Sequence, residues 1–248
     1  MMTLRTGDIH YRPFDDQGDD KHRPYGMRRM AWLYLISRKF WQTLVGIGGI
    51  AFLILWGMDR TPTGDNAPVD LTMLTARNET LLLHLAASLL ASVIGIAVWS
   101  PFGETERVSP VALPVMRAVH LLSMGVIGCI VIGLVIASWR DVIPGIDLVP
   151  LFVRNALFLT GIVLLAGWLI DVRLAWLLPV MFGGVTITGL LQDMANMTTP
   201  EDLWRGSGWN ILAQDLTHGH ATAICLGVAI GALMVYIRDG VRDTEGGE

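Results

Sequence analysis

Six long stretches with almost no charge constrain the fold of this 248-residue chain more than any other feature. A helix needs about 20 apolar residues to cross the hydrocarbon core of a bilayer. None of the stretches alternates polar and apolar residues, as the strands of a membrane barrel do. The sequence therefore predicts an all-α, polytopic integral membrane protein, with spans at about 40–58, 80–100, 116–139, 148–170, 174–193 and 216–237.

The shortage of charge excludes several classes of protein. Only 16% of the residues are charged, against about 25% in an average soluble domain. A typical soluble enzyme, a disordered chain and a disulfide-stapled secreted module are therefore excluded. The net charge of −4 argues against a nucleic-acid partner. Cys129 and Cys225 lie inside apolar stretches and are interpreted as small hydrophobic residues.

The distribution of Lys and Arg predicts the orientation in the membrane. If the N-terminus is cytoplasmic, 13 of the 18 Lys and Arg residues lie on the cytoplasmic side and 5 on the other. Cytoplasmic loops carry an excess of Lys and Arg. Both termini are therefore predicted to be cytoplasmic, and the first stretch begins too far from the start to be a cleaved signal peptide.

The segments between and before the spans have distinct compositions. Residues 1–26 and 239–248 are polar and are predicted to be cytoplasmic tails, the first of them flexible. Residues 27–39 are predicted to form a helix in the membrane interface, unless they extend the first span inward. The residues that support this interfacial helix are Arg28, Arg29, Trp32, Arg38 and Lys39. The outer loop 59–79 contains two prolines and is predicted to be irregular, whereas 193–215 suits short helices half-sunk in the outer interface.

Two local features predict how the spans pack. Only Asp171-Val172-Arg173 separates the fourth span from the fifth, so these two spans are predicted to be antiparallel neighbours. Small residues recur every four positions along one face of the sixth span, which is the pattern of close helix contacts in membranes. This ladder, which we expect to contact a helix of the same chain or of a second chain, consists of Gly219, Ala223, Gly227 and Gly231.

The chain lacks the common catalytic motifs. It contains no G-x-x-x-x-G-K-[ST] sequence, so it cannot hydrolyse ATP by a P-loop mechanism, and it is predicted not to be an enzyme. Ionisable groups at membrane depth are costly and are functional candidates. Those near span ends are His84, His120, Asp193, His218, His220 and Arg154, which is followed by Asn155. His84, His218 and His220 could gather a metal or haem, but their spacing favours histidines hydrogen-bonded at helix ends.

Two stretches resemble a known family. FGETERVSPVALPVMRAVH at 102–120 and RNALFLTGIVLLAGWLIDVRLAWLLP at 154–179 are similar to small actinobacterial ABC permease subunits. The overall layout also resembles the membrane subunit of an ABC-2-type (type V) exporter. This layout consists of an interfacial helix, six spans and a segment that dips between the last two spans. The resemblance implies a multi-pass protein of the bacterial cytoplasmic membrane, surrounded by lipid, that exports amphipathic or lipidic substrates.

The resemblance also implies roles for particular segments. Residues 27–39 would be a connector helix, and 197–215 would be re-entrant helices capping the exit. The loop at 100–114 would dock on a separate ATPase subunit that binds ATP and Mg²⁺, while this chain itself carries no cofactor. The docking residues would be Gly103, Glu104, Glu106 and Arg107, although this loop is shorter and richer in proline than a regular coupling helix.

The same family arrangement places two membrane subunits together. The chain would form a homodimer, or a heterodimer with another membrane subunit, and the substrate would pass between them. Two other functions remain open from the sequence. The chain could be an accessory or scaffold subunit of a larger membrane complex, or it could be a haem- or metal-bearing subunit of such a complex.

Overall fold

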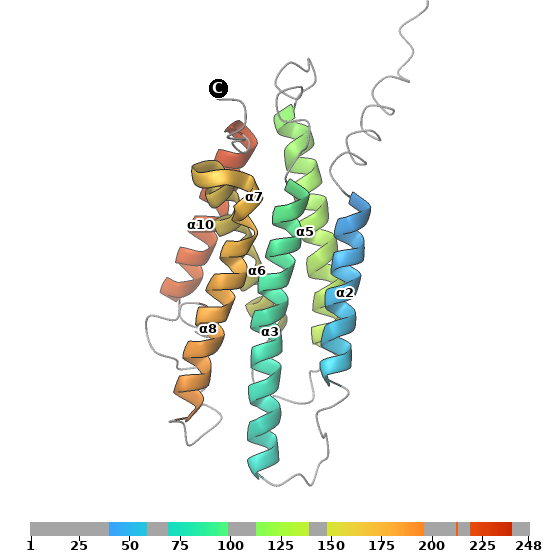
Figure 1. Cartoon of the computed structure of the whole chain (residues 1–248), viewed down its shortest axis with the longest axis vertical. Helices are drawn as coiled ribbons and strands as arrows, with labels where there is room; N and C mark the ends of the chain where they lie inside the picture. The colour runs from blue at the N-terminus through green and yellow to red at the C-terminus, as the bar shows by residue number, and fades with distance from the viewer. Residues whose placement is uncertain are drawn as a thin grey trace, which may run out of the picture.

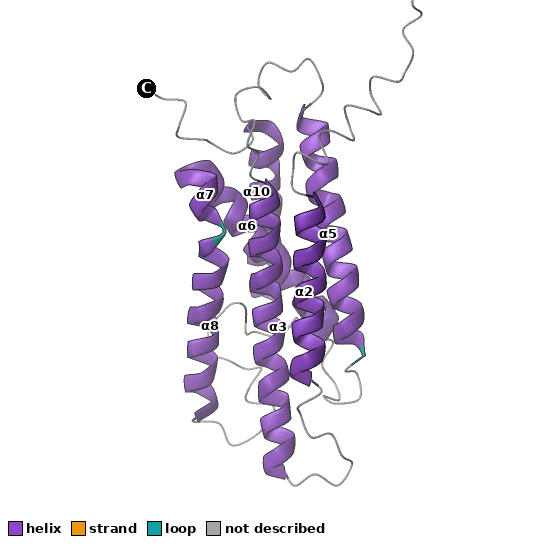
Figure 2. Cartoon of the chain, turned by 45° about the vertical axis from the view of Figure 1, so that its right-hand side comes forward, coloured by secondary structure: helices purple, strands orange, loops and turns teal. Residues whose placement is uncertain are grey.

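The structure, a computed structural model, describes residues 40–58, 69–98, 113–138, 148–195, 212 and 219–239. These residues are almost entirely helical and contain no strand, as Figure 2 shows. The helices are α2 (Phe40–Met58), α3 (Val69–Val98), α5 (Leu113–Ala137), α6 (Leu148–Ala166), the π-helix η1 (Gly167–Asp171), α7 (Val172–Ala175), α8 (Leu177–Ala195) and α10 (Gly219–Asp239). The predicted all-α class is confirmed for the described residues.

The long helices stand side by side and alternate in direction (Figure 1). We call the end of the bundle that holds the start of α2 and the end of α10 the upper end, as it is drawn in Figure 1. Helices α3 and α6 form the centre: α3 packs against α2, α5, α6 and α8, and α6 packs against α3, α5, α8 and α10. Helices α2 and α10 are therefore peripheral.

Five of the helices are long and apolar enough to cross a membrane: Phe40–Gly57, Leu81–Val98, Arg117–Ala137, Leu148–Ile170 and Gly219–Asp239. The apolar stretch described for α8, Leu177–Thr188, is shorter. The structure thus supports a multi-pass membrane protein, and the predicted fifth span, at about 174–193, stays a prediction. The tails, the interfacial helix 27–39 and the docking loop lie outside the described residues.

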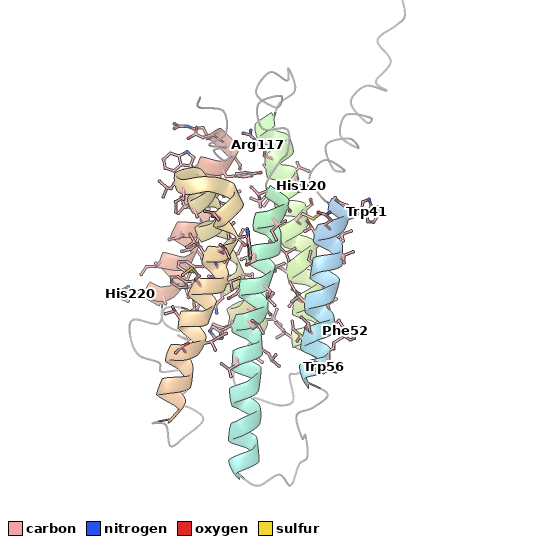
Figure 3. All side chains as sticks on the ribbon, in the orientation of Figure 1. Trp41, Phe52, Trp56, Arg117, His120 and His220 are labelled. Carbon is pink, nitrogen blue, oxygen red and sulfur yellow. The ribbon has the colours of Figure 1, made fainter. Side chains whose placement is uncertain are left out.

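Helix α2 has the side-chain distribution expected of a membrane-crossing helix at the edge of a bundle. Its buried face is aliphatic and includes Ile47, Ile50 and Ile54. Trp41 and Trp56 lie toward its two ends and are 63% and 51% exposed, and they point away from the bundle in Figure 3. Tryptophan favours the two membrane–water interfaces. A separation of 15 residues corresponds to about 22 Å along a helix, which places the two rings near opposite interfaces.

The prediction that the whole segment 59–79 is irregular is wrong. Helix α3 begins at Val69, so the last part of that segment is helical. The physical reason lies in the sequence, because both prolines of the segment precede Val69 and no glycine or proline follows before Thr80. The charged residues of this part lower its hydropathy, but they are compatible with a helix that continues beyond the membrane core.

The connection between α6 and α8 is itself helical. Helix α6 continues into the π-helix η1 and then into α7, and Trp176 is the only non-helical residue before α8. The prediction that these two spans are antiparallel neighbours is confirmed by their packing and by their directions in Figure 1. Pro179 lies in the first turn of α8, where its missing N–H removes no helical hydrogen bond.

Candidate functional site

A buried polar cluster lies between α3, α6 and the segment that joins α8 to α10. Leu212, the one described residue between those two helices, is 1% exposed and turns its carbonyl oxygen toward α3 and α6. Three side chains donate hydrogen bonds to this oxygen. The donors are His84 Nε2 at 3.0 Å, Arg154 Nη2 at 3.2 Å and Asn155 Nδ2 at 3.0 Å.

The cluster is also bonded within α6. Arg154 donates from Nε and Nη2 to the side-chain oxygen of Asn155, at 3.2 and 3.0 Å. The Asn155 amide therefore accepts from the guanidinium and donates to Leu212, which fixes its orientation. Because a carbonyl oxygen can only accept, the His84 ring carries its hydrogen on Nε2. We call His84, Arg154, Asn155 and the Leu212 carbonyl the Leu212 cluster.

The Leu212 cluster is almost closed to the outside. His84, Arg154 and Asn155 are 1%, 3% and 0% exposed. An ionised side chain at such a position is costly unless it is hydrogen-bonded, and hydrogen bonds to a charged donor are stronger than neutral ones. The same bonds that satisfy Arg154 hold Leu212 inside the bundle. The arrangement can therefore anchor a connecting segment.

Helix α3 positions His84 through a row of small residues. Ser88 Oγ donates to the His84 carbonyl and Ser92 Oγ to the Ser88 carbonyl, both at 2.9 Å. The one hydroxyl hydrogen of Ser92 is shared between the Ser88 carbonyl and the Trp176 carbonyl, which lies 3.1 Å from Ser92 Oγ where α7 ends. A methyl group on Gly183 of α8 would overlap Ser88 Oγ. This face of α3 is therefore the closest contact surface for α8.

The small-residue ladder of α10 faces away from the other described helices. All four of its residues, Gly219, Ala223, Gly227 and Gly231, are exposed, and a methyl group on any of the three glycines would meet open space. Of the two alternatives, these residues make no close contact with the other helices that the structure describes. Helix α10 instead approaches α6 at Gly161, where an added Cβ would lie 3.0 Å from Ala229 Cα. Contact of the ladder with a second chain stays a prediction.

Of the three histidines considered as metal or haem ligands, the two that the structure describes, His84 and His220, are not brought together. His84 is buried in the Leu212 cluster, whereas His220 is exposed on α10 and points outward in Figure 3. His218 lies outside the described residues. Among the residues that the structure describes, no three His, Cys, Asp or Glu side chains could hold a metal ion.

Sequence reasoning identified part of this site. His84, Arg154 and Asn155 stand out because polar residues are rare in apolar stretches, although their convergence was not predicted. Leu212 carries no such signal, because it acts through its backbone. The contact face of α3 was missed, yet it had a signal similar to the ladder of α10, since the small residues Ser88, Ser92 and Gly95 recur at intervals of four and three residues.

Several predicted segments lie outside the described residues. They are the docking residues Gly103, Glu104, Glu106 and Arg107, the interfacial residues of 27–39 and most of the segment 193–215.

Comparison of the chain with models of known protein families finds no match, and neither the characterised proteins nor the solved structures compared with it give one.

Proposed function

We propose that this chain is the membrane subunit of an ABC-2-type exporter in the bacterial cytoplasmic membrane. In this proposal, all six apolar helices span the bilayer, with the upper end of the bundle and both chain termini on the cytoplasmic side. A separate subunit hydrolyses ATP, and the transported substrate is amphipathic or lipidic. The chain itself binds, guides and releases the substrate without covalent chemistry.

The burial of Leu212 is the observation that supports this proposal most. An exporter of this type would carry a re-entrant segment between its last two spans, at the end opposite to the ATPase. Leu212 belongs to the corresponding segment, and the Leu212 cluster ties it to the two central helices. A connecting loop with no role at the exit would not need a buried arginine to hold it.

The proposed mechanism is mechanical. ATP binding brings the partner subunits together, and their movement is passed to the upper ends of the helices through the loop at 100–114. A bundle with two alternative packings can then switch access from one side to the other. The core of the described bundle is mainly aliphatic, which favours a substrate with apolar parts over an ion.

The test is to isolate the tagged chain from its own membrane with a mild detergent and to measure bound ATPase activity. We expect a P-loop ATPase subunit to accompany the chain. The double variant Glu104→Ala/Glu106→Ala should lower the co-purified activity about tenfold, which corresponds to about 1.4 kcal/mol of binding free energy.

The matched control is Glu79→Ala, which removes a carboxylate predicted to lie on the opposite side of the membrane and should leave the activity unchanged. Stable association with other membrane proteins, but with no ATPase, would contradict the proposal and favour an accessory subunit.

A further inference from the structure

An apolar groove of about 310 Å³ lies between α5, α6 and α10. Helix α6 forms its floor together with Leu90 and Ile94 of α3. The groove exists because α10 approaches α6 closely at Gly161, while Gly125 on the facing side of α5 contributes no side chain. A Cβ added at Gly125 would have no atom within 4 Å, so this glycine leaves usable space.

The groove opens sideways, toward the surroundings of the bundle. Its exposed lining residues come from three helices and include Leu122, Val126, Leu157 and Ile230. All belong to helix segments that are apolar enough to cross a membrane. The groove therefore opens at the depth of the hydrocarbon chains, and Thr160 is the one lining residue with a hydroxyl group.

Two arginines lie beyond the upper end of the groove. Arg117 precedes the lining residue Leu121 by four positions on α5, so both lie on one face of that helix. Figure 3 shows Arg117 at the upper end of the bundle. Arg238 follows the lining residue Leu233 on α10 by five positions, which is about 7.5 Å along the helix and about 140° around it, so it lies beyond the groove at the end of α10 and not on the lining face.

The Arg238 side chain is 84% exposed. It pairs with Asp239 through Nε at 2.9 Å, and this carboxylate offsets part of its positive charge. The groove is thus aliphatic along its length, and beyond one end lie two arginines, one of which is paired with Asp239. An acyl chain carrying a negatively charged headgroup has the complementary distribution.

We propose that this groove binds one acyl chain of an anionic phospholipid of the surrounding bilayer, whose headgroup lies against Arg117 and Arg238. The site goes beyond the proposed transport function and does not rest on it, because it needs only the membrane placement of α5, α6 and α10. The bound lipid fills the space between α5 and α10, which pack against each other less extensively than each of them packs against α6.

The first experiment compares lipid retention by native mass spectrometry. The full chain is loaded with phosphatidylglycerol or with phosphatidylcholine of identical acyl chains. Wild-type protein should retain one phosphatidylglycerol molecule more strongly than phosphatidylcholine. Gly125→Leu should lower the apparent lipid affinity about tenfold, because its side chain occupies the groove and removes methylene contacts.

The matched control is Gly184→Leu on α8, where an added Cβ also meets open space but which does not line this groove. It should retain lipid as the wild type does. The double variant Arg117→Gln/Arg238→Gln should lose the preference for phosphatidylglycerol while still binding an acyl chain. Equal retention by Gly125→Leu and wild type would overturn the proposal.

A second experiment needs no substitution, so it remains decisive if Gly125→Leu fails to fold. Wild-type protein in bilayers is irradiated with a phosphatidylglycerol that carries a diazirine in its acyl chain, and the labelled peptides are identified. We expect enrichment in 121–129 and 226–233, which line the groove. Equal labelling of the outward faces of α2 and α8 would overturn the proposal.

Discussion

The two sides of α6 differ in chemistry and in packing. Toward α3 and Leu212, α6 presents Arg154 and Asn155, which are buried and hydrogen-bonded. Toward α5 and α10 it presents Val153, Leu157 and Thr160, which line an open groove. One side is thus held by directional bonds and the other only by apolar contact. The comparison indicates that α6 is joined to α3 and Leu212 by polar bonds, and to α10 by close apolar packing at Gly161.

Asn155→Leu should produce the largest loss of stability. A single interhelical hydrogen bond in a membrane protein contributes about 0.6 kcal/mol on average. The substitution also removes the acceptor of two bonds from the buried Arg154 guanidinium, so we expect a loss of about 3 kcal/mol. The measurement is the free energy of unfolding in mixed detergent micelles.

Thr160→Val is the control for this prediction, because it changes a polar residue on the groove side of the same helix and should cost less than about 0.5 kcal/mol. Similar losses for the two variants would show that the two sides of α6 do not differ as described.

Gly183→Ala should have a smaller effect, and the adjacent Gly184→Ala provides a matched control. The new methyl group at 183 would overlap Ser88 Oγ and lie 2.8 Å from Ser88 Cβ. Overpacking of this kind costs about 1–3 kcal/mol. At 184 the methyl group meets open space, and replacing a helical glycine by alanine should be neutral or stabilise by up to about 1 kcal/mol. The same melting temperature for both variants would contradict the close contact between α3 and α8.

Gly227→Leu should have the smallest effect on the stability of the single chain, below about 0.5 kcal/mol, because the residue is exposed. If the ladder of α10 meets a second chain, the larger side chain separates the two helices. We then expect about tenfold weaker self-association, or about 1.4 kcal/mol. Energy transfer between labelled chains in bilayers measures this, with Gly184→Leu as the control. Unchanged self-association would refute the predicted dimer contact.

The fold could largely be predicted from the sequence, because long stretches without charged residues are a strong signal for membrane helices. The boundaries of α2 follow directly from the charges that flank it. The start of α3 at Val69 was missed because charge marks the membrane boundary and not the end of a helix. The site could be predicted only in part, since Arg154 and Asn155 are visible as polar residues, whereas the role of Leu212 belongs to its backbone.

The central claim is that the Leu212 cluster holds the segment between α8 and α10 inside the bundle. The most direct test is the labelling rate of Leu212→Cys by a membrane-impermeant thiol reagent, in a chain with Cys129 and Cys225 replaced by alanine. Leu212 contributes its carbonyl, so the substitution leaves the hydrogen-bond acceptor in place. We predict slow labelling while Asn155 is present and at least about tenfold faster labelling in Asn155→Leu, the increase expected when about 1.4 kcal/mol of anchoring is lost. Fast labelling in both backgrounds would contradict the claim.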